Sequence, residues 1–366
     1  MCLSKRKKLF FVLLVAVACF GLLEGGLRIF WERPPARVGD GLRNAGLYVR
    51  DAALGWRALP NRSVVHKAPG HDVIVTTNSR GFRDIEHGPK KPGVPRVIVL
   101  GDSFPLGYGV EDDENFVCYL REEVPKVEFV NLGVTAYDLR RAHTMLRAIG
   151  LGYEPDLVLL SVCQNDICMP EETAYLLTSK PRPPYDGIKA TLDKHCYVYA
   201  AVRTAVSRSR ALSLWLVDLG IKQPLGGYED LDRNVRTALR EYPSHLQRTW
   251  DLMCAELTAI KKTCDGSGIP LVVAAVPARE AVEPDVRRHG LAYYKYDEQD
   301  FDHDKPYAAL GALCRELDVA YVCPLEAFRR GKGLYSRWDI HFSPKGHRLF
   351  AKAIAPTIRE RLPAGP

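Results

Sequence analysis

The chain has 366 residues, of which 46% are hydrophobic, and this length and composition suit a globular protein with a large core and exclude fibrous and disordered classes. The formal net charge is +7, but Lys5, Arg6, Lys7 and Lys8 supply four of these charges and leave three for the remainder. Charge therefore argues against nucleic acid as the partner.

The first feature along the chain is an apolar run from Leu9 to Leu23, which follows the four basic residues. Extended through Trp31, past Glu24 and Arg28, the run reaches the roughly 20 residues that span a bilayer. Basic residues before such a run predict a cytoplasmic N-terminus. We interpret 1–31 as an uncleaved signal anchor, with cleavage of a leader as the alternative, and expect the remainder on the periplasmic or extracellular side.

The residues after the anchor are expected to form one enlarged domain. Residues 32–60 contain a Pro- and Arg-rich stretch and are interpreted as a stalk and linker, and 61–366 as the domain itself. Val73 to Thr77 has strand-like composition and predicts an added hairpin, with a substrate role for the following Arg80 or Arg83 as the weaker alternative. Prolines interrupt the pattern at about 168–244, which is read as an insertion that includes a helix over Tyr197 to Val217. This insertion is either a lid or acceptor-binding wall, or surface decoration.

Alternating strand and helix patterns predict a three-layer α/β/α sandwich of the flavodoxin-like type with a parallel sheet. Strands are expected near 96–100, 127–131, 156–162, 270–276 and 319–323. Helices are expected near 135–149, 247–264, 306–317 and 344–361.

A serine stands directly after the first of these strands. The run Val97 to Leu100 is followed by Gly101-Asp102-Ser103, which predicts a buried parallel strand that ends in a tight turn. Open α/β sheets bind ligands at this end of their strands. A helix over Phe104 to Val110 would direct free N–H groups and its positive dipole end at the serine hydroxyl's reaction site.

A histidine-bearing loop near the end of the chain complements this serine. Ser343-Pro344 has the form of an N-cap followed by proline at the first helical position, so Asp339 and His341 lie in the loop before the last helix. In an extended loop a carboxylate can turn to meet the imidazole two residues along. A serine hydroxyl is a poor nucleophile unless an imidazole accepts its proton, so these residues are candidates for one active site.

Together, Gly101-Asp102-Ser103 and the late Asp-His loop resemble the SGNH (GDSL-type) superfamily of serine hydrolases. Val127 to Gly133 resembles the family's glycine block, and Cys163-Gln164-Asn165-Asp166, which follows the predicted strand 156–162, resembles its asparagine block. All four pieces stand in the family's order. The chain has Cys163 where the family usually has glycine, and its aspartate precedes the histidine by two residues rather than three.

The resemblance implies that Ser103 is the nucleophile, His341 the base and Asp339 the group that orients it. It further implies an oxyanion hole from the N–H groups of Ser103 and Gly133 and the side-chain amide of Asn165. No cofactor is implied. Asp102 is expected to bond the backbone of the turn, and His347 to pack on the last helix.

No metal site is predicted. The acidic stretch 297–304 matches no calcium-loop spacing and is read as a solvated loop. The ten cysteines include no close Cys-X-X-Cys pair, and their spacing gives no disulfide connectivity.

These features lead to one main functional hypothesis and two alternatives. The main hypothesis is an esterase that hydrolyses acyl or acetyl esters of a cell-envelope carbohydrate or lipid-like molecule, anchored by its N-terminal helix. The first alternative is an O-acetyltransferase of an exported polysaccharide, which a similarity to alginate-acetylating SGNH proteins with Asp-X-His supports. The second is a catalytically silent envelope-binding protein that retains the fold.

Overall fold

The fold is described from a computed structural model. It describes residues 5–31, 47–68, 71–168, 191–192, 195–209, 211–212, 215–216, 219, 235–337 and 339–362. The chain divides into two compact units. The N-terminal unit comprises residues 1–39 and 179–213, and the main unit comprises residues 40–178 and 214–366.

The main unit is built on a five-stranded sheet with the order β6-β5-β7-β8-β9, in which every pair of neighbours is parallel. This is the 2-1-3-4-5 order of flavodoxin-like sheets, as predicted. Each residue of β5, β7 and β8 is buried, which explains their continuous apolar sequences. The strands are β5 (Arg96–Leu100), β6 (Glu128–Asn131), β7 (Leu157–Val162), β8 (Leu271–Ala275) and β9 (Ala320–Val322).

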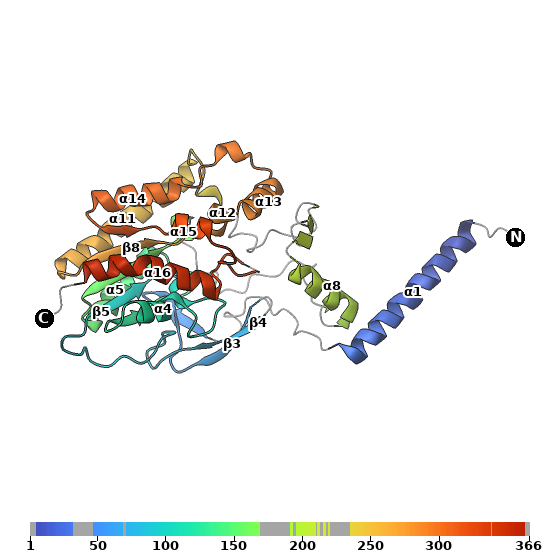
Figure 1. Cartoon of the computed structure of the whole chain (residues 1–366), viewed down its shortest axis with the longest axis horizontal. Helices are drawn as coiled ribbons and strands as arrows, with labels where there is room; N and C mark the ends of the chain where they lie inside the picture. Colours follow the sequence, from blue (N-terminus) through green and yellow to red (C-terminus); the bar gives the residue numbers. More distant parts are fainter. Residues whose placement is uncertain are drawn as a thin grey trace. The chain divides into compact units, whose positions relative to one another are not determined.

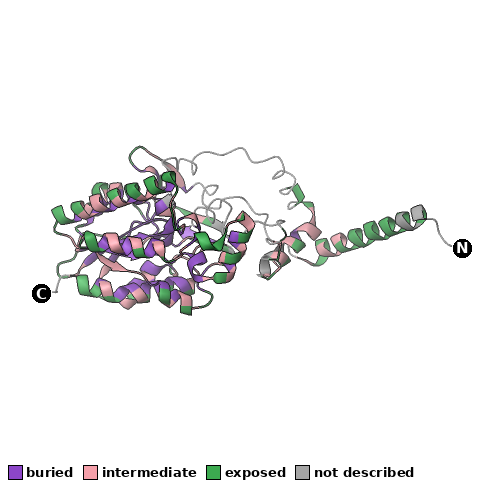
Figure 2. Cartoon of the chain, turned by 90° about the horizontal axis from the view of Figure 1, so that it is seen from above, coloured by how far each residue is buried: buried purple, intermediate pink, exposed green. Residues whose placement is uncertain are grey.

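Helices cover both faces of this sheet (Figure 1). Helices α4 (Phe116–Glu123) and α16 (Pro344–Arg361) pack against each other, and α5 (Leu139–Ala148) packs against α11 (Ser244–Gly266). Right-handed crossovers between parallel strands put these two pairs on opposite faces, with α14 (Lys305–Glu316) beside α11. Buried residues gather in the strands and on the inward helix faces (Figure 2). The predicted three-layer sandwich is confirmed.

Shorter helices connect these layers. The predicted helix Phe104–Val110 ends early, because Gly107 at φ 81° takes up the left-handed conformation that terminates a helix. The short elements are α3 (Ser103–Leu106), η1 (Gly150–Tyr153), α6 (Gln164–Cys168), α12 (Arg279–Val282), α13 (Pro284–Tyr294), η3 (Glu298–Asp300) and α15 (Leu325–Arg330).

Two antiparallel hairpins precede the sheet. One joins β3 (Ser63–Ala68) to β4 (His71–Thr76), in line with the expected hairpin. The other joins β1 (Tyr48–Asp51) to β2 (Gly55–Ala58), and its Trp56 is fully buried in the main core. The expected linker over 32–60 is therefore too long at its C-terminal end, because alternate burial along β2 ties this segment to the main unit.

The N-terminal unit contains α1 (Lys5–Phe30) and α8 (Tyr197–Arg208), which pack on each other. Within α1, the 21 residues Phe10–Phe30 are long and apolar enough to cross a membrane, a property that signal sequences share. The helix expected over 197–217 ends at Arg208 as α8, and Val217 lies outside the described residues.

The cysteines whose side chains are described are all free thiols. Burial raises the pKa of Cys264 and of Cys314 to about 12, so both stay protonated at neutral pH. The side chains of Cys2 and Cys168 lie outside the described set. The free cysteines are Cys19, Cys118, Cys163, Cys196, Cys254, Cys264, Cys314 and Cys323.

Candidate active site

Ser103 lies at the carboxyl end of β5, as the first residue of α3. The turn before it requires glycine: Gly101 has φ 148°, and a Cβ there would come within 2.9 Å of Ser161 Oγ. Asp102 caps α3, because its carboxylate accepts a hydrogen bond from the Phe104 N–H at 3.1 Å. The first N–H groups of a helix have no acceptor within that helix, so the Ser103 N–H has no partner inside α3.

His341 joins Ser103 to Asp339. Its Nε2 lies 2.7 Å from Ser103 Oγ, and its Nδ1 lies 3.3 Å from Asp339 Oδ1. The same carboxylate oxygen accepts the His341 backbone N–H at 2.8 Å, so Asp339 fixes the loop as well as the ring. The rings of Tyr108 and Phe104 lie 4.4 and 5.2 Å from the imidazole, between centroids. The geometry assembles the three residues expected from the sequence.

Asp339 stays ionised despite its surroundings. Burial acts to raise its pKa, but the His341 imidazole and backbone N–H and the Arg279 guanidinium together hold the pKa of Asp339 below its usual range. Arg279 is itself buried, at 2% exposure, on α12 after β8. It donates to the carbonyls of Asp339 and Ser336 at 2.8 and 2.7 Å and to the Glu283 carboxylate at 2.8 Å. Arg279 thus ties the Asp339 loop to the end of β8, a role that the sequence did not indicate.

The expected oxyanion donors have different surroundings. The Asn165 amide donates to Asp102 Oδ2 at 2.9 Å, and because a carboxamide has two N–H bonds, the second remains for another acceptor. The Gly133 N–H donates to Asn131 Oδ1 at 3.0 Å. Gly133 was expected to hold its N–H free for the oxyanion, and in this structure that N–H is already engaged.

The loop after Gly133 contains a second unusual feature. Ala136 has φ 60°, in the left-handed region that favours glycine, and such strain is concentrated at functional sites. The side chains of β1 and β2 hold this loop: Trp56 Nε1 donates to the Thr135 carbonyl at 3.1 Å, and Tyr48 Oη donates to Thr135 Oγ1 at 3.0 Å. No motif in the sequence marks Ala136, because φ depends on these tertiary contacts.

Asp102 connects the serine turn to the asparagine loop. Its Oδ2 accepts from Asn165 and, at 3.1 Å, from Cys163 Sγ, and Cys163 also contacts Asn165 Oδ1. Burial, with Asp102 and Asp166 nearby, raises the pKa of the Cys163 thiol well above its usual range. Burial and the Asp102 charge likewise raise the pKa of Asp166, which accepts from the Cys163 N–H at 2.8 Å. Asp102 is the turn residue expected, and it additionally orients Asn165.

Arg83 and His347 have structural roles. Arg83 is 3% exposed and donates to carbonyls of residues 74, 106, 107 and 110 and to the Asp112 carboxylate. It therefore holds the segment that follows Ser103. His347 is buried on α16, where its Nδ1 accepts the Phe116 N–H at 3.2 Å, and burial lowers its pKa to about 3. The expectation that His347 packs on the last helix is met.

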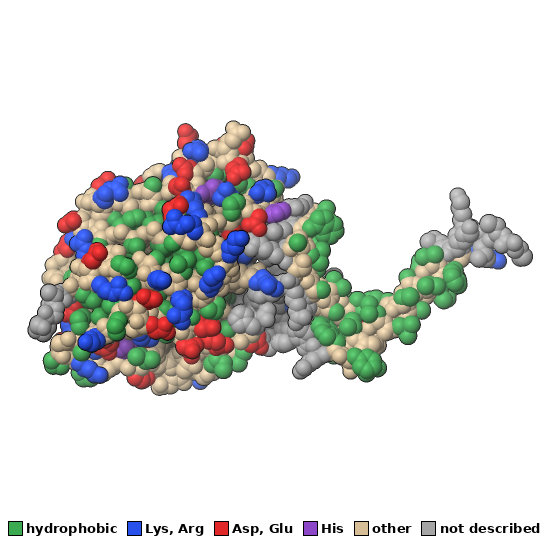
Figure 3. Space-filling view, in the orientation of Figure 1, with side chains coloured by type: hydrophobic (Ala, Val, Ile, Leu, Met, Phe, Trp, Pro, Cys, Tyr) green, Lys and Arg blue, Asp and Glu red, His purple; other side chains and the backbone are tan. Residues whose placement is uncertain are grey.

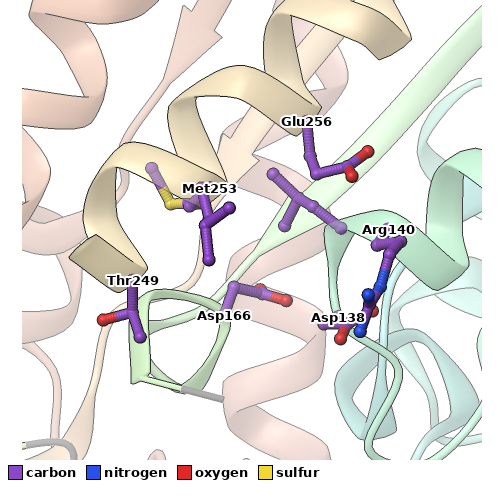
Figure 4. A pocket seen from close by; sticks show the side chains of 8 residues that line it. Asp138, Arg140, Asp166, Thr249, Met253 and Glu256 are labelled. Carbon is purple, nitrogen blue, oxygen red and sulfur yellow. The ribbon is translucent and has the colours of Figure 1, made fainter. Parts of the chain in front are cut away.

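Two hollows lie near these residues. The first holds about 280 Å³, partly open to solvent. It is lined by Phe104, Cys163, Gln164, Asn165, Val276, Ala278, Arg279 and Ile340. The second holds about 480 Å³ between the start of α5, α6 and α11, and Asp138, Arg140, Asp166, Thr249, Met253 and Glu256 line it (Figure 4). Asn165 lines the first and its neighbour Asp166 the second, so α6 borders both. Among the described residues, no His, Cys, Asp and Glu side chains group as a metal site would require.

Comparison with known proteins gives a likeness in fold. No protein-family model and no curated protein matches the sequence. The chain is similar to a solved putative lipolytic protein of the G-D-S-L family from Desulfitobacterium hafniense, with 13% identity, coverage of 71% of this chain and 98% of that one, and a TM-score of 0.38. It is also similar to a putative acylhydrolase from Bacteroides fragilis, with 12% identity, coverage of 75% and 91%, and a TM-score of 0.41.

The crystal structure of TesA is a third similar structure, with 12% identity, coverage of 73% of this chain and 99% of that one, and a TM-score of 0.40. At these identities the likeness concerns the fold.

Proposed function

We propose that the chain is a serine hydrolase of the SGNH type that cleaves esters through Ser103. The observation that carries the proposal is the 2.7 Å contact between Ser103 Oγ and His341 Nε2, with Asp339 on the opposite side of the imidazole. A proton on Nδ1 faces Asp339 and leaves Nε2 as the acceptor that the serine hydroxyl requires.

The proposed reaction proceeds through an acyl-enzyme. His341 takes the Ser103 proton as Oγ attacks the ester carbonyl, and the resulting oxyanion accepts hydrogen bonds from the Ser103 N–H and the Asn165 amide. His341 then protonates the leaving alcohol, and a water molecule, deprotonated by the same imidazole, releases the acid and regenerates the serine. A contribution from the Gly133 N–H requires that it leave Asn131, so we assign the larger share to the other two donors.

The substrate class follows from the hollow beside the site and from α1. Val276, Ala278 and Ile340 make part of the hollow apolar, while Asn165 and Arg279 place polar groups in it, a lining that is compatible with an acyl group on a polar alcohol. We therefore propose acyl or acetyl esters of a cell-envelope carbohydrate or lipid-like molecule. Transfer of the acyl group to a sugar hydroxyl instead of water uses the same acyl-enzyme.

We also propose that α1 anchors the chain in a membrane. Hydrophobic side chains cover α1 (Figure 3), and between Phe10 and Leu23 the large ones are exposed in the chain by itself. The basic residues in the first turn of the helix favour a cytoplasmic N-terminus and a catalytic unit on the outer side.

The test is labelling of the detergent-solubilised full chain with a fluorophosphonate, followed by mapping of the modified peptide. We expect modification at Ser103, its loss in Ser103→Ala and a strong reduction in His341→Ala, because the reagent requires an activated serine. His245→Ala, an exposed histidine, is the matched control and should label normally. Folded protein that takes up no label would contradict the proposal and favour a catalytically silent protein. A second assay distinguishes hydrolysis from transfer: hydrolysis releases free acetate, whereas transfer leaves the acetyl group on an added oligosaccharide.

A further inference from the structure

The N-terminal unit contains an ion pair inside the apolar helix α1. Arg28 donates to Glu24 at 2.9–3.0 Å, one turn apart. The Glu24 carboxylate also accepts the backbone N–H groups of Tyr197 and Val198 at 2.9 and 2.8 Å. These are the first N–H groups of α8 and have no acceptor within that helix, so Glu24 satisfies them and places a negative charge at the positive end of the helix dipole.

Arg28 completes the same contact from the other side. Its guanidinium donates to the His195 carbonyl at 2.6 Å and lies 5.0 Å above the Tyr197 ring centroid. Trp31 meets that ring edge to face, with the centroids 6.3 Å apart. We call the contacts of Glu24 and Arg28 with residues 195–198 the Glu24 clamp. Residues 24–27 of α1 are half-buried, whereas the large apolar residues before them are exposed.

The clamp lies where α1 would leave a bilayer. Counted from Leu9, directly after the basic residues, about 20 helical residues cover the roughly 30 Å hydrocarbon core and end near Arg28. Charged side chains near the end of a membrane-crossing helix are costly unless they are paired, and the clamp gives both Glu24 and Arg28 a partner. Trp and Tyr are enriched at the membrane boundary, and the rings of Trp31 and Tyr197 meet beside the clamp.

Helix α8, which begins at the clamp, has an apolar surface. Val202 is 57% exposed and Ala205 is also exposed, while Ala200 is fully buried. Arg203 is the single charged residue in the first eleven positions of α8. A short helix that is mostly apolar suits the interface plane of a membrane.

We infer that α1 is retained in the mature protein and that α8 lies in the outer interface of the bilayer that α1 crosses, with Val202 against lipid. The inference rests on the proposed anchoring and extends it from one helix to two. Removal of α1 as a leader would take Glu24 away from the α8 N-terminus. The lipid surface is the occupant of the exposed α8 face because the clamp joins that face directly to the membrane-crossing helix.

The test uses the full chain in nanodiscs of phosphatidylcholine and phosphatidylglycerol, with p-benzoylphenylalanine in place of Val202. Ile85, an apolar residue of the main unit with the same 57% exposure, is the matched control position. On illumination we expect lipid adducts at position 202 in at least about tenfold excess over position 85, and an intact mass that includes α1. A mature chain that lacks α1, or position 202 without lipid adducts, would overturn the inference.

Two clamp variants give a second readout. Glu24→Ala removes both acceptor oxygens and should lower the lipid adducts at position 202 at least fivefold, while Glu24→Gln keeps one oxygen and should retain more of them. If both variants and the unaltered chain gave equal yields of lipid adducts, the clamp would not hold α8 at the membrane. Fluorophosphonate labelling of the same nanodiscs separates the two proposals: adducts without Ser103 labelling contradict only the hydrolase, and labelling without adducts contradicts only the inference.

Discussion

At the scale of single residues, the serine and the histidine could be recognised from sequence because each stands in a local pattern. Ser103 follows a buried strand and a glycine turn, and His341 precedes a capped helix. Arg279 could not be recognised, since its contacts with Ser336 and Asp339 join segments about 60 positions apart. The engagement of Gly133 did have a local signal: an Asn side chain that accepts the N–H two residues on is a common turn.

Arg279 is a positioning residue for Asp339, and its replacement should alter the pH dependence of the reaction. Burial already favours the protonated Asp339 carboxyl, so loss of the adjacent positive charge in Arg279→Ala should raise the pKa of Asp339. The acid limb of the kcat/KM profile for a p-nitrophenyl ester should then move to higher pH, and kcat should fall about 10- to 100-fold as the loop loosens.

Arg279→Lys keeps the charge and should restore most of the pH profile but less of kcat, because one ammonium cannot reach three acceptors. Arg287→Ala, a change in a less buried arginine on α13, is the control. An unshifted acid limb in Arg279→Ala would show that Arg279 acts only through packing.

At the scale of elements, the long strands and helices were predictable because burial on one or both faces leaves a regular apolar period. The hairpin β1–β2 was not predictable, since strands of four residues are too short to show a regular alternation of apolar and polar residues. Its role also depends on tertiary contacts. Trp56 donates to the Thr135 carbonyl, and its own carbonyl accepts the Tyr137 hydroxyl.

Trp56→Ala should therefore affect both stability and turnover. Loss of a fully buried tryptophan costs about 3–5 kcal/mol, and release of the loop at Thr135 should lower kcat as well. Thermal unfolding and ester hydrolysis below the transition measure the two effects. Arg57→Ala, the neighbouring residue on the exposed face of β2, should change neither by more than a small amount. A near-native melting temperature for Trp56→Ala would mean that 48–58 is a linker after all.

At the scale of the whole molecule, the free energy of unfolding should fall as the pH is lowered, because His347 is buried in its neutral form. The pKa of His347 is about 3 in the folded chain, because of burial and the nearby His341 and Arg83 charges, against about 6.5 when unfolded. A group whose folded pKa is depressed in this way is neutral in both states above pH 6.5. Below that value only the unfolded chain takes up the proton, so stability falls by up to about 1.4 kcal/mol per pH unit down to about pH 3.

Denaturant unfolding between pH 7 and pH 4 measures this slope. His347→Gln has no imidazole to protonate and keeps an oxygen that can accept the Phe116 N–H, so its free energy of unfolding should fall less steeply with acid than that of the unaltered chain. His245→Gln, at an exposed position, should leave the slope unchanged. Parallel slopes for His347→Gln and the unaltered chain would contradict the assignment.

The separation of Ser103 and His341 by 238 positions has a consequence for biosynthesis. The ribosome delivers α1 first, then β5 to β7 with the serine, then α8 with its partners for Glu24, and only afterwards β8, β9 and the histidine loop. The contact between α1 and α8 in the N-terminal unit can thus form while the sheet still lacks β8 and β9. Because the histidine loop is synthesised 238 positions after Ser103, the serine of the nascent chain has no imidazole beside it until that loop has been made and has folded.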